Sequence, residues 1–413
     1  MLDVRDGTDP GTSVAVLDVD DLNVRFPTSD GVVHAVRGVS YRLQPGEVLG
    51  IVGESGSGKS VTSMAVMGLL GKSARVTGSI KFRGRELLGM GDRDMSGVRG
   101  RGIAMVFQDP MTSLNPVYKI GHQLAEALQT HVPDMSDDDA RRRSLELLDL
   151  VGIPDAKQRV DQYPHEFSGG MRQRVVIAIA MANQPDVIIA DEPTTALDVT
   201  VQAQVLDVLR AAQRETHSAI VLITHDLGVV AGMADRVMVM YAGRPVELGS
   251  VEDIYYRPRM PYTVGLLGSL PRVDIGERQR LTPIQGSPPS LLNLPPGCPF
   301  TPRCPMSRPN CETEEPLFRS VGAEHGAACH YSEELRDLEH SAEIFDVTST
   351  DAGLPSDDGP QAIDPLKDGP VGSTPEPPRD DDDGARIPTS ELGTPAGDRP
   401  HLEAPANEGP GYQ

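Results

Sequence analysis

Short apolar runs rich in β-forming residues fill the first part of the chain. Between residues 14 and 49, the runs VAVLDV, LNVRF, VVHAV and VSYRL are broken by Pro27, Gly31 and Gly38. Short runs bounded by proline and glycine are typical of β-strands, because these two residues interrupt regular strand geometry. We expect an antiparallel strand layer over this segment.

From residue 48 onward, each apolar run is followed by a loop and then by a helical pattern. VLGIV leads into a glycine-rich loop, IAMVF into a polar loop, DVIIA into DEPTTALD, and SAIVLIT into HDLG. Strands that alternate with helices indicate a buried parallel sheet covered by those helices. The pattern therefore predicts an α/β fold.

A helical insertion is expected between the second and third of these strands, over about residues 109–182. Ser136 followed by Asp139 is typical of a helix N-cap, and Gly152 after LELLDLV suits a C-cap. The insertion is predicted to be mostly helix.

The chain becomes rich in proline and irregular in pattern after about residue 255. All four cysteines fall between Cys298 and Cys329, and twelve prolines with few aromatic residues follow from Ser341 onward. Such a tail cannot bury enough apolar surface to offset the entropy of ordering. We expect four parts: a flexible N-terminus (1–13), one α/β domain (14–254), an irregular extension with a cysteine cluster (255–335) and a disordered acidic tail (336–413).

The formal net charge of −22 argues against general affinity for nucleic acid or anionic lipid. Twelve of these charges lie in residues 341–413, which hold sixteen acidic and four basic side chains. No apolar run reaches the roughly 18 to 20 residues of a membrane-spanning helix, and the first residues lack a secretory signal pattern. We expect a cytoplasmic chain that does not itself cross a membrane.

A phosphate-binding motif follows the first strand of the α/β part. Residues 53–60, GESGSGKS, fit the pattern G-x-x-x-x-G-K-[ST] between a strand and a helix. Its candidate nucleotide-binding residues are Gly53, Ser55, Gly56, Ser57, Gly58, Lys59 and Ser60. The glycines let backbone N–H groups approach phosphate oxygens, Lys59 neutralises the β- and γ-phosphates, and Ser60 offers a hydroxyl to Mg²⁺. The alternative is a Gly/Ser-rich turn that matches by chance.

Two further segments carry candidate chemistry. VIIADE is an apolar strand that ends in Asp191, suited to hold Mg²⁺, and Glu192, suited to polarise a water molecule. The alternative is a strand end with two solvated acids. FSGGMRQ opens a helix at Ser168 with two glycines, which is another anion-binding helix start but a common one.

The order of these motifs resembles the ABC ATPase family over roughly residues 14–250. Gln108 resembles the glutamine of the Q-loop, residues 195–198 (TALD) the D-loop, and His225 the switch histidine. Phe26 lies where the family has an aromatic residue that stacks on adenine. The resemblance implies a P-loop NTPase core with a parallel sheet, an antiparallel β subdomain and a helical insertion. Two departures are Met171 in place of the signature glutamine and Phe26 in place of the more common tyrosine.

The resemblance also implies a mechanism. Two cassettes pair head to tail, so that ATP held by Lys59 of one is closed over by Ser168, Gly169 and Gly170 of the other. Glu192 would act as the base for the attacking water. Gln108 would contact Mg²⁺ and that water, and His225 would hold the γ-phosphate.

Longer stretches are similar to the ATPases of oligopeptide and dipeptide importers. They are VRFPTSDGVVHAVRGVSYRLQPGEVLGIVGESGSGKS, FQDPMTSLNPVYKIG, YPHEFSGGMRQRVVIAIAMA and, in the extension, IQGSPPSLLNLPPGCPFTPRC. This likeness implies uptake of peptides and four kinds of partner: two membrane permease subunits, a second ATPase (or a second copy of this chain), an extracytoplasmic solute-binding protein and the peptide. Importers of nickel or other small solutes share the extension and stay open as alternatives. A further alternative is a soluble ABC protein that acts on ribosomes or DNA, although such proteins generally carry two cassettes and basic surfaces. Another alternative is a nucleotide-dependent sensor of redox state or metal.

The cysteines are spaced Cys298-x5-Cys304-x6-Cys311-x17-Cys329. Four thiolates in a loop-rich segment can ligate zinc or an iron–sulfur cluster, and the spacing alone does not decide between them. The likeness to the peptide importer ATPases implies a structural 4Fe-4S cluster. Zinc and unligated thiols stay open as alternatives.

Overall fold

The computed structural model describes residues 15–195, 197–269 and 284–337. These residues all belong to one compact unit, Met1–Thr350, and the second unit, Asp351–Gln413, lies outside them. The flexible N-terminus expected at 1–13 and nearly all of the expected acidic tail also fall outside the described residues.

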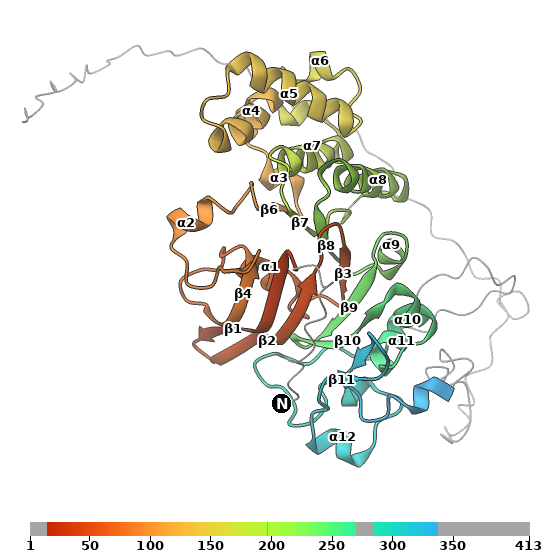
Figure 1. Cartoon of the computed structure of the whole chain (residues 1–413). Helices are drawn as coiled ribbons and strands as arrows, with labels where there is room; N and C mark the ends of the chain where they lie inside the picture. The colour runs from red at the N-terminus through yellow and green to blue at the C-terminus, as the bar shows by residue number, and fades with distance from the viewer. Residues whose placement is uncertain (1–14, 196, 270–283, 338–413) are drawn as a thin grey trace, which may run out of the picture. The chain divides into compact units, whose positions relative to one another are not determined.

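An antiparallel sheet of four strands forms the first layer, in the order β2-β1-β4-β5 (Figure 1). Its strands are β1 (Leu17–Thr28), β2 (Gly31–Leu43), β4 (Arg75–Phe82) and β5 (Arg85–Glu86). β1 pairs antiparallel with β2 on one side and β4 on the other. The antiparallel layer predicted from the first apolar runs is confirmed.

A second sheet of eight strands has the order β11-β12-β10-β9-β3-β8-β7-β6. Its parallel strands are β3 (Val48–Val52), β6 (Ile103–Val106), β7 (Val187–Asp191), β8 (Ala219–Thr224) and β9 (Arg236–Tyr241). β10 (Arg244–Ser250) continues the sheet antiparallel to β9. The predicted parallel core is present and is extended by an antiparallel edge.

The strands β7 and β8 are buried on both faces. Ile188 and Leu222 pack in the core beneath the helices, whereas Ile189 and Val221 pack in the core shared with the antiparallel sheet. Successive side chains of a strand point to opposite faces, so an uninterrupted apolar run fills two cores at once. This explains why VIIA and AIVLI have no polar alternation.

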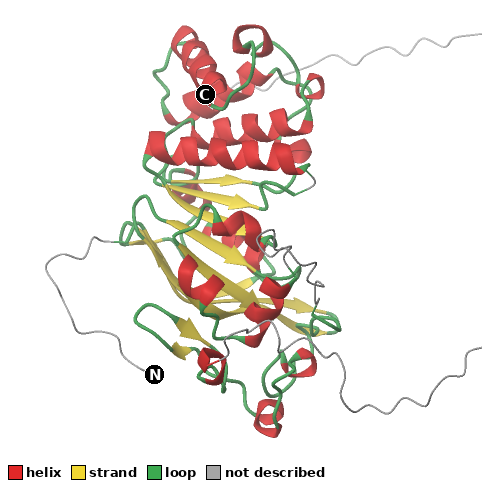
Figure 2. Ribbon diagram, turned by 90° about the vertical axis from the view of Figure 1, so that its right-hand side faces the viewer, coloured by secondary structure: helices red, strands yellow, loops and turns green. Residues whose placement is uncertain are grey.

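Helices surround these strands. They are α1 (Lys59–Val66), α2 (Asp92–Ser96), α8 (Val199–Thr216) and α9 (Leu227–Ala231), together with the insertion helices α3 (Pro110–Ser113), α4 (Ile120–His131), α5 (Asp137–Leu150), α6 (Ala156–Arg159) and α7 (Gly169–Met181). Figures 1 and 2 show α4 to α7 gathered beyond one edge of the large sheet. The predicted helical insertion is therefore present.

The caps predicted for α5 are also present. Ser136 Oγ accepts the backbone N–H of Asp139 at 3.1 Å. Gly152, two residues past the helix end, has a φ of 69°, a left-handed conformation that favours glycine. Local sequence therefore sets both ends of this helix.

The part of the extension from residue 284 to 337, here called the cysteine segment, has more regular structure than expected. β12 (Gly326–Ala327) pairs with β10, and β11 (Arg319–Ser320) pairs with β12. The helices of the extension are α10 (Val251–Tyr256), α11 (Pro261–Gly268), α12 (Pro309–Thr313) and the short 3-10 turns Thr301–Arg303 and Glu334–Asp337. The segment therefore continues the large sheet of the α/β domain.

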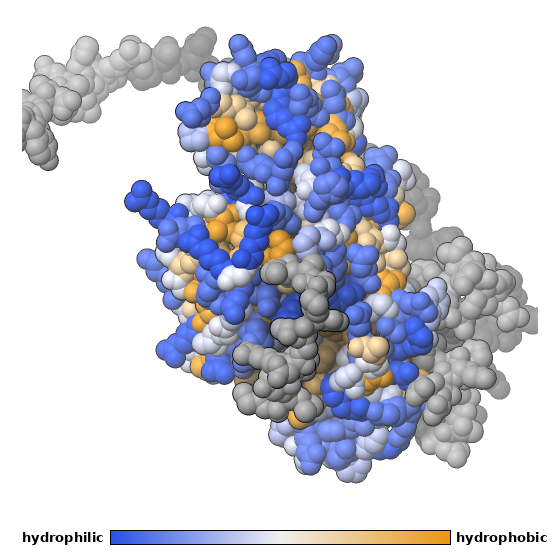
Figure 3. All heavy atoms as spheres, viewed as in Figure 1, coloured by the Kyte–Doolittle hydropathy of each residue, from blue (hydrophilic) through white to orange (hydrophobic). Residues whose placement is uncertain are grey.

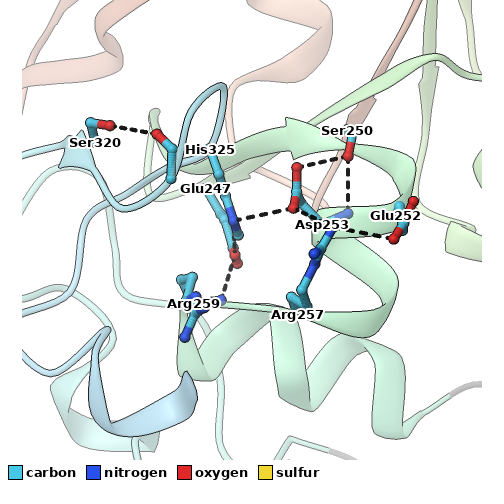
Figure 4. Close-up of polar contacts among 9 residues, drawn as sticks. Glu247, Ser250, Glu252, Asp253, Arg257, Arg259, Ser320 and His325 are labelled. Atoms are coloured by element: carbon cyan, nitrogen blue, oxygen red, sulfur yellow. Dashed lines mark hydrogen bonds and ion pairs between the residues drawn. The ribbon is translucent and has the colours of Figure 1, made fainter. Parts of the chain in front are cut away.

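A buried carboxylate helps to fasten this segment. Glu247 of β10 is fully buried, and its Oε1 lies 2.8 Å from Nε2 of His325, just before β12 (Figure 4). The same oxygen accepts the backbone N–H of Arg259 at 2.5 Å. Burial raises the pKa of Glu247, because removal from water disfavours the charged form.

Small apolar patches are scattered among hydrophilic side chains on the face of the insertion helices seen in Figure 3. Along the described stretches of chain, every helix is too short or too polar to cross a bilayer.

Candidate active site

The phosphate-binding motif forms the turn between β3, which ends at Val52, and α1, which begins at Lys59. Gly53 and Gly58 have φ values of 151° and 97°. A Cβ atom would lie 2.2 Å from the carbonyl oxygen of Met240 at Gly53, and 2.5 Å from that of Ala35 at Gly58. Both positions therefore require glycine, for backbone conformation and for close approach.

Lys59 points back into this turn. Its side chain is buried, and Nζ donates to the carbonyl oxygens of Gly53 at 2.6 Å and Glu54 at 3.0 Å. Burial lowers the pKa of Lys59, although the carboxylates of Glu192, Asp191 and Glu54 oppose this shift. A triphosphate in the turn would supply negative charge beside an ammonium group that has lost much of its hydration.

Ser60 and Asp191 form the second part of the site. Ser60 Oγ donates to Asp191 Oδ1 at 2.9 Å, and Asp191 lies at the end of β7 with 6% exposure. Burial raises the pKa of Asp191, which indicates a carboxylate that would gain from a nearby cation. A hydroxyl and a carboxylate are ligands suited to Mg²⁺, so these two side chains fit the ion expected from the sequence.

Glu192 is the point where three polar side chains meet. Its Oε2 accepts from Thr195 Oγ1 at 2.8 Å and from Gln108 Nε2 at 3.0 Å, and lies 3.6 Å from Nδ1 of His225. Glu192 has a φ of 47°, which is uncommon for a residue other than glycine. A strained backbone that is held by its surroundings is a common feature of functional sites.

One pocket joins the nucleotide turn to these side chains. It is lined by Ser55, Gly56, Ser57, Gly58, Lys59, Ser60, Val61, Gln108, Glu192 and His225. Phe26, on β1, and Gly53 are not among these residues, so stacking of Phe26 on adenine stays a prediction. Val61 and the hydroxyl of Thr195 were not predicted to contribute. The contact of Thr195 with Glu192 could have been suspected from the sequence, because Thr195 lies only three residues after Glu192 in DEPTT.

The Ser168 helix start is intact but lies apart from this pocket. Ser168 caps α7, and its Oγ accepts the backbone N–H of Met171 at 3.3 Å. Ser168, Gly169 and Gly170 do not line the pocket of their own chain. Their expected role toward a second cassette stays a prediction.

The four thiols lie close enough to affect one another. Burial raises the pKa of Cys304 to about 12 and that of Cys329 to about 11, and the other thiols add to both shifts. The N–H of Cys298 donates to the carbonyl oxygen of Cys311 at 2.8 Å, and all four cysteines are free thiols. Among the described residues, no three His, Cys, Asp or Glu side chains are placed to hold a metal ion. Neither the zinc site nor the 4Fe-4S cluster considered from the sequence is supported by this arrangement.

Family models match two parts of the chain. The ABC transporter model matches residues 36–195, and the model of the oligopeptide/dipeptide transporter C-terminal region matches residues 246–311. The first match covers the nucleotide turn, Gln108, Ser168 and Glu192. The second covers most of the strand β10 and the first three cysteines.

Curated relatives agree with these matches. The oligopeptide transport ATP-binding protein OppD of Mycobacterium tuberculosis is 58% identical over 80% of this chain and 54% of its own length, so the chain spans about half of that relative. The dipeptide transport ATP-binding protein DppD of Bacillus subtilis is 56% identical over 73% of this chain and 90% of its own length. OppD of Salmonella typhimurium is 53% identical, with 75% and 91% covered.

Solved structures agree as well. A dimeric ATP-binding cassette in a post-hydrolysis state, bound to ADP and Pi, aligns with a TM-score of 0.52 and 26% identity. The alignment covers 57% of this chain and 98% of that one. The fold, the order of the motifs and the identities to whole relatives place this chain in the ABC transporter ATP-binding protein family, in the group that includes oligopeptide and dipeptide transport ATP-binding proteins.

Proposed function

We propose that this chain binds and hydrolyses ATP to drive uptake of oligopeptides or dipeptides by an ABC importer at the cytoplasmic face of the membrane. The observation that carries the proposal is the convergence of Gln108, Thr195 and His225 on Glu192, beside the nucleotide turn. The names of the relatives support peptide as the cargo class. Nickel or another small solute is the alternative cargo.

In this proposal the triphosphate lies in the turn of residues 53–58, with Lys59 against the β- and γ-phosphates. Ser60 and Asp191 would hold Mg²⁺, which would neutralise charge on the phosphates. Glu192 Oε2 takes a proton from water as the water oxygen attacks the γ-phosphorus and the bond from that phosphorus to the bridging oxygen breaks. Gln108 and Thr195 would orient this carboxylate, and His225, which lines the same pocket, would donate to the γ-phosphate. ADP and inorganic phosphate leave.

A partner cassette completes the site in this proposal. Ser168, Gly169 and Gly170 of one chain would approach the triphosphate of the other, because the helix start they form offers N–H groups to an anion. The dimeric solved structure supports pairing of two cassettes. Two permease subunits and an extracytoplasmic solute-binding protein would complete the importer.

We propose further that the four cysteines hold a 4Fe-4S cluster with a structural role. The support is a donor set of four free thiols, of which Cys304 and Cys329 have their pKa raised further by other thiols. Cys298, Cys304, Cys311 and Cys329 would hold the cluster, which would crosslink this segment. Anaerobic purification with iron and sulfide analysis tests this proposal. Protein that is fully folded and contains neither element contradicts it.

Uptake of labelled di- to hexapeptides tests the cargo. A strain that lacks this chain should lose uptake, and the parent chain should restore it. The Lys59→Ala variant should not restore it, because the turn would lack its ammonium group. Peptide uptake that continues unchanged in the deleted strain, with loss of nickel uptake instead, would favour the alternative cargo.

A further inference from the structure

Glu54, the second residue of the phosphate-binding motif, is held at three points. Its backbone N–H donates to Tyr262 Oη at 2.9 Å, and its carbonyl oxygen accepts from Lys59 Nζ at 3.0 Å. Its carboxylate binds the guanidinium of Arg303 through two parallel hydrogen bonds of 2.6 and 2.8 Å. Two of the three partners, Tyr262 and Arg303, come from the extension beyond residue 254.

Arg303 is itself held firmly. Its side chain is only 4% exposed, and Nε donates to the carbonyl oxygen of Gln285 at 3.1 Å. Nη1 also lies 3.3 Å from Tyr241 Oη, and the guanidinium is 5.9 Å from the ring centres of Tyr241 and Phe300. The contact with Glu54 raises the pKa of Arg303, so this side chain stays charged. A paired arginine whose buried side chain makes four hydrogen bonds is a rigid support for its carboxylate partner.

The backbone of Arg303 is fixed by the cysteine segment. Arg303 ends the 3-10 turn Thr301–Arg303, which lies between Cys298 and Cys304. Thr301 Oγ1 donates to the carbonyl oxygen of Cys311 at 3.0 Å, and the N–H of Cys304 donates to that of Thr301 at 3.2 Å. The position of the guanidinium therefore depends on how this segment is folded.

We infer that Arg303 is a positioning residue for the nucleotide turn and that, through it, the cysteine segment sets the affinity for ATP. This inference rests on the proposed ATP-binding function and extends it to a residue 249 positions away in the sequence. Arg303 does not line the nucleotide pocket. It acts through Glu54.

Arg303 should strengthen ATP binding through two physical effects. Glu54 places a carboxylate in a turn that must receive a triphosphate, and its charge is close enough to act on Lys59. Arg303 neutralises that carboxylate, which lowers its repulsion of phosphate. The paired hydrogen bonds also hold the turn in its binding conformation before ATP arrives, so less ordering is required on binding. Loss of Arg303 should therefore weaken ATP binding more than it slows the chemical step.

The experiment compares ATP titration and steady-state ATP turnover for the full-length chain and four variants. Arg303→Met should raise the dissociation constant and KM for ATP about tenfold, with kcat within about twofold, since a charged bidentate pair is among the stronger hydrogen-bonded contacts. Arg303→Lys should recover part of the loss, because the charge remains and the paired geometry does not. Glu54→Gln combined with Arg303→Met removes both charges and should lie between Arg303→Met and the parent.

Arg319→Met is the matched control. Arg319 makes a more exposed bidentate contact with Glu333 at 2.6 and 2.7 Å, and also donates to the carbonyl oxygen of Cys329, without touching the nucleotide turn. Its ATP affinity should equal that of the parent. Thermal unfolding of each variant separates loss of affinity from loss of fold, and the double variant supplies a folded comparison if Arg303→Met is unstable.

The outcomes are distinct. Equal ATP affinity in the parent, Arg303→Met and the double variant would overturn the positioning role and leave the proposed function intact. The same weakening in Arg319→Met would show a general effect of the segment and would also overturn it. A parent chain that fails to bind ATP at all would overturn the proposed function, and the inference with it.

Discussion

Gln108 Nε2 donates to Glu192 Oε2 at 3.0 Å, although the two residues are 84 positions apart in the chain. Gln108 follows β6, and Glu192 follows its parallel neighbour β7. The carboxyl ends of parallel strands meet at one edge of a sheet, which is where ligands bind in open α/β sheets. The pairing of these strands therefore brings the proposed base and its orienting amide together.

Glu192→Gln should abolish most ATP turnover while ATP binding persists. The amide keeps the size of the side chain but cannot take a proton from water, and general bases typically contribute a factor of about 10² to 10⁴. The measurement is phosphate release under saturating ATP, with nucleotide titration in parallel. Size-exclusion chromatography should show that the variant accumulates as an ATP-bound dimer. Turnover at the parental rate would show that Glu192 is not the base.

Lys59→Ala should weaken ATP binding, whereas Glu192→Gln affects the hydrolysis step. The buried ammonium group donates to the carbonyl oxygens of Gly53 and Glu54 and is the only positive charge lining the described pocket, apart from any charge on His225. Its removal should raise the dissociation constant for ATP at least about tenfold and abolish turnover, because the β- and γ-phosphates lose their main counter-charge. Equilibrium titration checks this. Arg142→Ala, an exposed pair with Asp139 on the insertion helices, should bind ATP normally.

Ser168→Arg should abolish ATP hydrolysis at the nucleotide site of the partner chain and leave the nucleotide site of its own chain intact. The substituted side chain would place bulk where the partner's triphosphate is proposed to lie, while the pocket around Lys59 keeps all its lining residues. The test mixes this variant with a second copy that carries Glu192→Gln and measures turnover of the mixture. If instead Ser168→Arg alone loses ATP binding to its own turn, the proposed exchange of signature loops between chains is wrong.

Glu247→Gln should change how stability depends on pH. The pKa of Glu247 is raised above its ordinary value of 4.5, so over the interval above 4.5 the folded chain retains a proton that the unfolded chain has released. Stability from this group is therefore present at low pH and falls as pH rises, at up to about 1.4 kcal/mol per pH unit. A glutamine at position 247 does not titrate, so it adds no pH dependence to the free energy of unfolding. The difference in free energy of unfolding, variant minus parent, should rise as the pH increases above about 4.5.

Denaturant unfolding at several pH values measures this difference. Glu252→Gln is the control, because Glu252 is an exposed carboxylate on the adjacent helix α10, paired with Arg257 (Figure 4). Its difference from the parent should stay flat over the same range. A flat difference for Glu247→Gln as well would contradict the raised pKa.

Features that depend on neighbours along the chain can be predicted without the structure. The turn at residues 53–58 is predicted by its motif between a strand and a helix, whereas the close approach of Met240 and Ala35 to its glycines is visible only in the fold. The N-cap of α5 can be predicted from the sequence, because the hydroxyl of Ser136 accepts the backbone N–H of Asp139 only three residues later. The strands that are buried on both faces can be predicted from the sequence, because their apolar runs show no alternation with polar residues.

Contacts between distant residues became evident from the packing of the folded chain. The contact between Glu54 and Arg303 spans 249 positions, and nothing in the local pattern of CPFTPRC shows that its arginine faces the nucleotide turn. The pairing of β12 with β10 was hidden as well, because a two-residue strand has no periodicity to detect. Such contacts follow from how the sheet and the cysteine segment pack, and packing is a property of the whole fold.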